Sequence, residues 1–217
     1  MLIFTVIAIA SMLAGNLLAL RQRNIKRLLA YSSIAHLGYI LVAFLAGNQL
    51  GIEAVSFYLV AYFITSLGAF GVVALLSDTK RDADRLRDFR GLFWRRPGTA
   101  AIFTAMLLSL AGIPLTAGFV GKFYILASGV NTQHWLLVFM LVLNSVIGLY
   151  YYIKVIAAMF AQTVPNQKKE RKVLHPAISF ATGATMAILA LLLIWLGVYP
   201  TTLVQLIRGL LATIVMT

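Results

Sequence analysis

The sequence predicts an all-α, polytopic membrane protein with about six transmembrane helices, one of them broken. Of the 217 residues, 61% are hydrophobic and only 11% are charged. A soluble domain of this length cannot bury so much apolar surface around one core. The apolar residues also fall into charge-poor runs, each close to the roughly 20 residues that a helix needs to cross a bilayer.

The runs place spans near residues 2–20, 24–46, 54–77, 99–130, 135–160 and 176–200. The first begins almost at Met1, with no basic stretch before it and no small-residue cleavage site, so we expect a spanning helix rather than a signal peptide. The tail Thr201–Thr217 is short for a further span, and we expect it to lie at the membrane interface.

The basic residues mark one side of the membrane. The first, third and fifth connectors between the spans lie on the same side and, with one adjoining helix start, hold 15 of the 18 Lys and Arg residues. The opposite side has only Arg208. By the positive-inside rule the basic connectors are cytoplasmic and both chain ends periplasmic. Topology therefore explains the net charge of +12, and we expect no nucleic-acid binding. The basic residues are Arg21, Arg23, Lys26, Arg27, Lys80, Arg81, Arg85, Arg87, Arg90, Arg95, Arg96, Lys168, Lys169, Arg171 and Lys172.

The third connector, residues 78–98, mixes acidic and basic side chains. Two interpretations stay open for it: a short amphipathic or helical surface loop, or a solvated charged linker.

The fourth span is too long for one straight helix. Residues 99–130 would extend about 48 Å, against an apolar bilayer core of about 30 Å. Gly112, Pro114 and Gly118 interrupt its middle, and proline lacks a backbone donor and clashes with the preceding turn. We expect a break between about Leu110 and Gly118. Broken helices inside membranes line cavities or ion pathways.

Four ionisable residues are candidates for a place inside the membrane: Lys26, His36, Lys122 and Lys154. The predicted spans contain no Asp or Glu. An ionisable group in hydrocarbon is costly and is kept mainly where it is sheltered and useful.

Lys122 and His36 carry the sharpest hypotheses. Lys122 follows the break, where a desolvated amine could exchange protons near neutral pH; alternatively its long stem snorkels to the periplasmic surface. His36 lies about 18 Å along its helix from Asn24, near mid-membrane. With Ser32 and Tyr39 on the same face it could relay protons, or it could be a neutral hydrogen-bonding strut between helices.

The remaining polar residues favour simpler roles. Lys26, near the cytoplasmic start of its helix, is expected to be a topology charge or interface anchor, with a proton role as the alternative. Lys154, near the cytoplasmic end of the fifth span, is explained by snorkelling, again with a proton role as the alternative. Asn16 and Asn144 could hydrate a polar axis or pin helices together.

Other chemistries find no support in the sequence. The chain has no cysteine, which excludes a disulfide, an iron–sulfur cluster or a thiolate metal site on it. Its three histidines are too scattered for a metal site, and no phosphate-binding loop or nucleophile set is recognisable. The function that the sequence favours for this chain is therefore the transport of a small ion.

Several stretches together resemble the antiporter-like membrane subunits of respiratory complex I. They are NIKRLLAYSSIAHLGY from Asn24, SLAGIP from Ser109 with the following GF and GKF, DFRGL from Asp88 and IGLYYY from Ile147. The resemblance covers nearly the whole chain. Asn24 before Ile-Lys-Arg, and His rather than Gln at position 36, are most similar to the subunit N branch of NADH:quinone oxidoreductase. The L and M branches and the cation/proton antiporter subunits remain alternatives.

The resemblance implies a fold of about fourteen helices with two inverted five-helix repeats, each with a broken helix and a buried lysine. Residues 1–160 would be the second repeat, and residues 161–217 a cytoplasmic loop, the last transmembrane helix and a short tail. The N-terminal half of the subunit would be missing. Lys122 matches the broken-helix lysine of the half-channel that opens to the periplasm, while Lys26 and His36 match polar residues of the same family.

The function implied by the resemblance is proton translocation in the membrane arm of a redox-driven NADH:quinone oxidoreductase of the bacterial inner membrane. Flavin and iron–sulfur clusters would belong to other subunits, with no cofactor on this chain. The implied partners are other membrane-arm subunits, the missing N-terminal half and the lipid bilayer. The alternatives are a sodium/proton antiporter subunit of the multisubunit type, or a structural membrane-arm component without a working channel.

Overall fold

The computed structural model describes residues 1–77, 82–162 and 176–216, and residues 78–81, 163–175 and 217 lie outside this description. All regular secondary-structure elements of the described residues are helices, which confirms the all-α prediction. Five helices are long and apolar enough to cross a membrane, and one shorter apolar helix accompanies them. The helices are α1 (Leu2–Leu20), α2 (Ile25–Ala46), α3 (Gln49–Leu76), α4 (Leu86–Phe89), α5 (Leu92–Arg95), α6 (Pro97–Ala111), α7 (Ala117–Asn131), α8 (Trp135–Phe160), α9 (Pro176–Val198) and α10 (Pro200–Met216).

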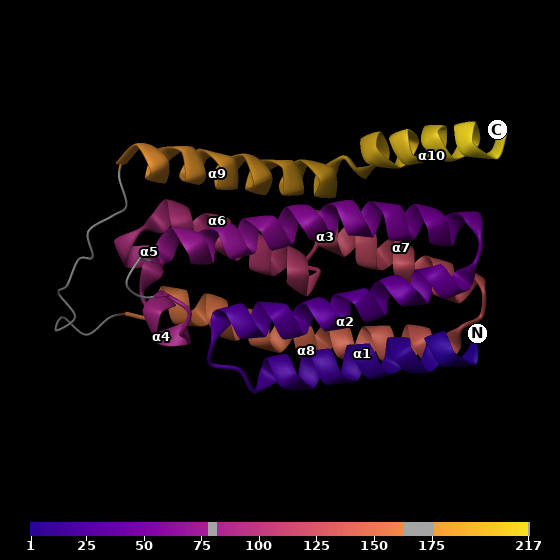
Figure 1. The fold of residues 1–217 in the computed structure, drawn as a ribbon, viewed down its shortest axis with the longest axis horizontal. Helices are drawn as coiled ribbons and strands as arrows, with labels where there is room; N and C mark the ends of the chain where they lie inside the picture. The colour runs from indigo at the N-terminus through magenta and orange to yellow at the C-terminus, as the bar shows by residue number, and fades with distance from the viewer. Residues whose placement is uncertain (78–81, 163–175, 217) are drawn as a thin grey trace.

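The long helices run side by side along one axis of the molecule (Figure 1). α1, α2 and α3 alternate in direction, α7 continues the course of α6, and α8 returns. Short turns with local signals join them. Gly47, at φ 61°, ends α2 in the left-handed region, and Asn48 then caps α3 by accepting a hydrogen bond from the Gly51 amide at 2.7 Å. Left-handed glycine C-caps and asparagine N-caps are common helix boundaries.

The third connector is folded in its described part. Residues 82–98 contain the two short helices α4 and α5, whose Phe89 and Leu92 are buried. The Leu86 amide donates to the Arg23 carbonyl at 2.9 Å, and the Trp94 indole donates to the Phe160 carbonyl at 3.1 Å. The helical interpretation of this connector is therefore confirmed for these residues. Six of the basic residues predicted to be cytoplasmic lie outside the residues that the structure describes: Lys80, Arg81, Lys168, Lys169, Arg171 and Lys172.

The start of α3 corrects one prediction. The third span was expected to begin at residue 54, with no carboxylate in any span, yet α3 begins at Gln49 and carries Glu53 in its second turn. Glu53 is 3% exposed. The error arose because the Asn48 cap starts the helix before the apolar run does. Hydropathy alone could not show that a partner elsewhere in the chain neutralises the charge.

The C-terminal tail forms the helix α10, which runs on beyond α9 and lies alongside the Gln49 end of α3 (Figure 1). Its Val204 and Ile207 are buried, while Leu206 and Leu210 are exposed. The expected position at the membrane interface stays a prediction.

Candidate functional site

The fourth predicted span is broken where its sequence indicates. α6 ends at Ala111 and α7 begins at Ala117, so Pro114 lies in a five-residue connection between two half-helices. Gly112 caps α6 at φ 83°, and the Thr116 side chain caps α7 by accepting from the Phe119 amide. A helix end leaves backbone groups without partners in its own helix. The break thus places unpaired carbonyls of α6 inside the bundle.

Lys122 supplies the hydrogen bonds that these carbonyls lack. Its Nζ donates to the carbonyl oxygens of Leu110 at 2.8 Å and Ala111 at 3.0 Å, and to the Ser145 hydroxyl of α8 at 3.2 Å. The residue is 8% exposed, so the amine points into the bundle and does not snorkel. The carbonyls at a helix C-terminus carry partial negative charge, which favours a cation. Nζ also lies 5.3 Å from the centre of the Tyr39 ring, within cation–π range.

Two glycines make this arrangement possible. A Cβ on Gly112 would lie 2.9 Å from Cδ of Lys122, and a Cβ on Gly118 would lie 2.0 Å from the carbonyl oxygen of Ser109. The Gly118 amide instead donates to the Ser109 hydroxyl at 3.1 Å. Gly112 leaves space for the lysine stem, and Gly118 lets the two half-helices touch.

His36 lies between two tyrosines from other helices. Its Nδ1 is 2.6 Å from the Tyr58 hydroxyl of α3, and its Nε2 is 3.1 Å from the Tyr152 hydroxyl of α8. A neutral imidazole donates from one nitrogen and accepts at the other, and it can exchange these roles by taking up and releasing a proton. The His36 ring also packs edge-on against Tyr39 at 5.5 Å. Tyr39 therefore joins His36 to Lys122.

Asn16 and Asn144 extend the same buried region. The Asn16 amide donates to the Tyr39 hydroxyl at 3.1 Å and to Oδ1 of Asn144 at 3.2 Å, and it accepts from the Tyr151 hydroxyl at 2.9 Å. Both asparagines are fully buried. Their hydrogen bonds join α1, α2 and α8 and so pin these helices together, while hydration of a polar axis stays a prediction. We call the following residues the buried polar cluster: Asn16, His36, Tyr39, Tyr58, Lys122, Asn144, Tyr151 and Tyr152.

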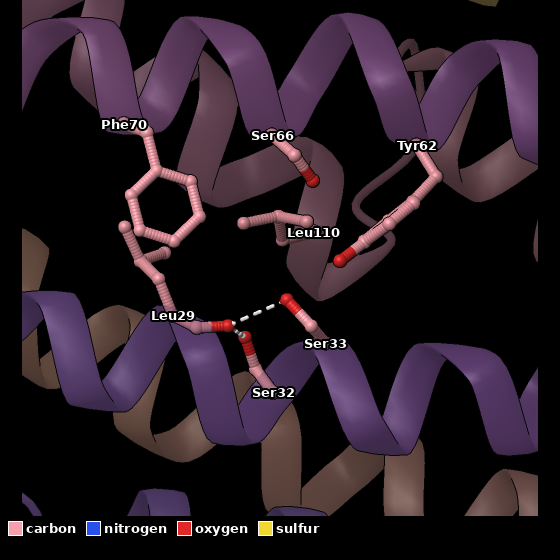
Figure 2. A pocket seen from close by; sticks show the side chains of 7 residues that line it. All are labelled: Leu29, Ser32, Ser33, Tyr62, Ser66, Phe70 and Leu110. Atoms are coloured by element: carbon pink, nitrogen blue, oxygen red, sulfur yellow. Dashed lines mark hydrogen bonds between the residues drawn. The ribbon is translucent and has the colours of Figure 1, made fainter.

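A narrow crevice between α2 and α3 lies beside the cluster, between His36 and the end of α2 that adjoins the basic connectors. Figure 2 shows the hydroxyls of Ser33, Ser66 and Tyr62 pointing into it, with Leu110 behind them. The Tyr62 ring lies 5.2 Å from that of His36, and the Leu110 carbonyl is a partner of Lys122. The crevice has no space wide enough for a water molecule in this conformation.

The other two predicted residues lie outside the cluster. Lys26 pairs with Asp82 at 2.7 Å, and their side chains are 38% and 61% exposed. Lys154 is exposed on the outer face of α8, in an open groove beside Tyr150 and Ile153. Of the four candidates, the structure brings together only Lys122 and His36.

Sequence reasoning missed Tyr58 and Tyr152 as partners of His36, and it missed Glu53. A tyrosine in an apolar span is a signal, because a buried hydroxyl normally finds a partner. Sequence spacing does not say which partner, since Tyr58 is 22 residues and Tyr152 116 residues from His36 along the chain.

Comparison with known proteins identifies the family of this chain. A family model described as NADH:quinone oxidoreductase/Mrp antiporter, transmembrane, matches residues 1–148. NADH-quinone oxidoreductase subunit N of Ectopseudomonas mendocina (strain ymp) is 52% identical over 213 residues, which cover 95% of this chain and 42% of that protein. The same subunit of Nitrosospira multiformis is 55% identical over 219 residues, covering 94% of this chain and 43% of that protein. The chain thus spans about two fifths of the length of these curated relatives.

Solved structures show the same fold. A chain of respiratory complex I from Thermus thermophilus with bound aureothin is 32% identical, with a TM-score of 0.80 over 94% of this chain and 44% of that one. A chain of the Mrp complex from Dietzia is 21% identical, with a TM-score of 0.82 over 95% of this chain and 46% of that one, a likeness of fold alone. On the match over residues 1–148, the chain belongs to the NADH:quinone oxidoreductase/Mrp antiporter family of transmembrane subunits.

Proposed function

We propose that this chain is part of a subunit that carries protons across the bacterial inner membrane, in the membrane arm of a redox-driven NADH:quinone oxidoreductase. The observation that carries the proposal is the buried Lys122 amine at the helix break, whose hydrogen-bond partners are two carbonyls and a hydroxyl. These partners are neutral, so release of a proton from Lys122 leaves no carboxylate among them without its counter-charge. The residue can therefore be loaded and unloaded without breaking an ion pair.

The proposed route passes through the buried polar cluster. A proton enters from the side of the basic connectors along the crevice hydroxyls of Ser33, Ser66 and Tyr62, which become connected by water when the crevice widens. His36 passes it on, because its two ring nitrogens face different tyrosine hydroxyls. Lys122 then holds the proton at the break. We assign the basic connectors to the cytoplasm and both chain ends to the periplasm.

Lys26 and Lys154 are proposed as anchors rather than proton carriers. Lys26 has a carboxylate partner near the basic connectors, and Lys154 lies on the outer face of α8. These placements support the topology and snorkelling roles that their sequence positions favoured.

The remaining assignments rest on the relatives. We propose that the rest of the subunit and other membrane-arm subunits are the partners of this chain in the bilayer. The flavin and iron–sulfur chemistry would then reside elsewhere, with no cofactor on this chain. The description of the family model also names the Mrp antiporter, which supports a second candidate, a subunit of a sodium/proton antiporter.

The test is redox-driven proton uptake in membrane vesicles that contain the full-length subunit, normalised to the amount of assembled complex. Lys122→Ala removes the titrating amine and should lower pumping by about a hundred-fold or more, the contribution typical of a proton-transfer group. Lys122→Arg keeps the charge but cannot release its proton near neutral pH, so it should also impair pumping.

Near-normal pumping by Lys122→Ala would refute the proposed function. Full activity of Lys122→Arg would instead reduce the residue to a fixed positive charge. Sodium-driven proton exchange in the same vesicles, without NADH, would favour the antiporter candidate.

A further inference from the structure

The end of the bundle opposite the basic connectors holds one buried acidic side chain. Glu53 lies in the second turn of α3 and is 3% exposed. Among the described residues the other carboxylates, those of Asp82, Asp84 and Asp88, lie in the connector at the opposite end. A buried carboxylate in an apolar helix is costly and calls for a specific role.

Glu53 is neutralised by the C-terminal helix. Nε of Arg208 donates to one carboxylate oxygen at 3.0 Å, and Nη2 donates to the other at 2.9 Å. This fork-to-fork geometry is the strongest arrangement for such a pair. The Arg208 side chain is 56% exposed while that of Glu53 is 4% exposed. The pair therefore connects a buried proton-binding oxygen to the surface at the basic-poor end.

Glu53 also lies close to the buried polar cluster. Tyr58, which binds His36, is five residues further along α3, about 7.5 Å along the helix axis. The Tyr58 ring packs against Gly121, next to Lys122 in α7. Phe57, one turn from Glu53, stacks on Tyr124 of α7 at 5.9 Å. The seam between α3 and α7 thus joins the cluster to the ion pair, with two aromatic rings along the way.

We propose that Glu53 is the group through which the buried polar cluster releases its proton on the basic-poor side, and that Arg208 closes this exit as its counter-charge. This inference rests on the proposed function. It adds a path by which the proton leaves the buried polar cluster on the basic-poor side, which Lys122 and His36 do not supply by themselves.

The transfer requires only protons and water. A proton leaves the Lys122 ammonium, crosses the seam along water that enters when α3 and α7 separate, and binds a carboxylate oxygen of Glu53. Lys122 becomes a neutral amine that can take up the next proton. Arg208 cannot give up its own proton, so the pair opens only when Glu53 is protonated. Glu53 then releases the proton to water outside and binds Arg208 again.

The experiment uses the full-length subunit in the assembled complex and measures NADH-driven proton uptake in vesicles, normalised to assembly. Glu53→Gln keeps the shape and one acceptor oxygen for Arg208 but cannot titrate, so pumping should fall by about ten-fold. Glu53→Asp keeps a carboxylate and should retain pumping within about three-fold. The control is Gln205→Ala, an exposed position on the same helix as Arg208, which should pump normally.

The charge swap Glu53→Arg with Arg208→Glu distinguishes a proton-carrying role of Glu53 from a purely structural ion pair between α3 and α10. It restores the ion pair between α3 and α10 but leaves no carboxylate at position 53, so pumping should stay as low as in Glu53→Gln. Recovery by the swap, or near-normal pumping by Glu53→Gln, would overturn the inference. If the swap does not assemble, the neutral double variant Glu53→Gln with Arg208→Gln replaces it, with the same two outcomes.

Lys122→Ala in the same vesicles keeps the two proposals apart. Normal pumping by Lys122→Ala refutes the proposed function. Loss of pumping by Lys122→Ala together with normal pumping by Glu53→Gln refutes only the exit through Glu53.

Discussion

Lys122 and Lys154 are both lysines in apolar helices, yet the structure places them in opposite environments. Lys122 is buried and makes three hydrogen bonds, whereas Lys154 is exposed on the outside of α8. The difference follows from the helices that surround them. α6 ends inside the bundle and offers free carbonyls, while α8 is continuous from Trp135 to Phe160 and uses its carbonyls within itself.

This comparison teaches that a broken helix creates the site for a buried cation. The carbonyl dipoles at the end of α6 stabilise the Lys122 ammonium without a fixed anion. Glu53 shows the contrasting solution, because its helix is unbroken and it is neutralised by a full opposite charge on Arg208. The dipoles let Lys122 lose its proton without breaking an ion pair, whereas Glu53 can bind a proton only when it separates from Arg208.

The largest expected effect comes from adding a side chain at the close contact between the half-helices α6 and α7. In Gly118→Ala the new Cβ would lie 2.0 Å from the Ser109 carbonyl oxygen, so α6 and α7 must move apart. Overpacking of this kind costs about 1–3 kcal/mol, and the displaced carbonyls would no longer hold Lys122. Proton uptake normalised to assembly should fall by about ten-fold.

Gly98→Ala is the matched control for that variant, because it lies in α6 and its added Cβ would meet no atom within 4 Å. If Gly118→Ala and Gly98→Ala pump equally well, the close contact at the break does not support the lysine site.

A smaller effect is expected from Ser145→Ala. It removes the Ser145 hydroxyl, which accepts from Lys122 at 3.2 Å, and leaves the two carbonyls in place. Lys122 keeps its two shorter hydrogen bonds to carbonyls, so pumping should fall by only about three-fold, equivalent to about 0.6 kcal/mol, while assembly is unchanged. Thr5→Ala, which removes an exposed hydroxyl on α1, serves as the control. A loss as large as that of Lys122→Ala would mean that the hydroxyl, and not the helix end, holds the amine.

The smallest effect is expected from Lys154→Ala. An exposed lysine outside the cluster acts as an anchor, so its removal should change proton uptake by less than about two-fold. Uptake is measured in the same vesicles as for Lys122→Ala. A ten-fold loss would break the comparison between the two lysines and would place the outer face of α8 on the proton route.

Much of the fold could be predicted because its determinants are local. Hydropathy located the long helices, and the glycines and proline between Leu110 and Gly118 predicted the break that separates α6 from α7. These features act within a few residues of their position, through the length of an apolar run or the geometry of one backbone turn. The spacing around His36 and Lys122 also singled out the two residues that the structure brings into one cluster.

The sequence by itself therefore determined the all-α membrane architecture, the broken helix and the identity of the buried lysine. Only the tertiary structure decided the partners: Tyr58 and Tyr152 for His36, two carbonyls for Lys122, and Arg208 for Glu53. The physical reason is the distance along the chain, because Glu53 and Arg208 are separated by 155 residues. No local rule relates such positions, and helix packing alone brings the two charges together.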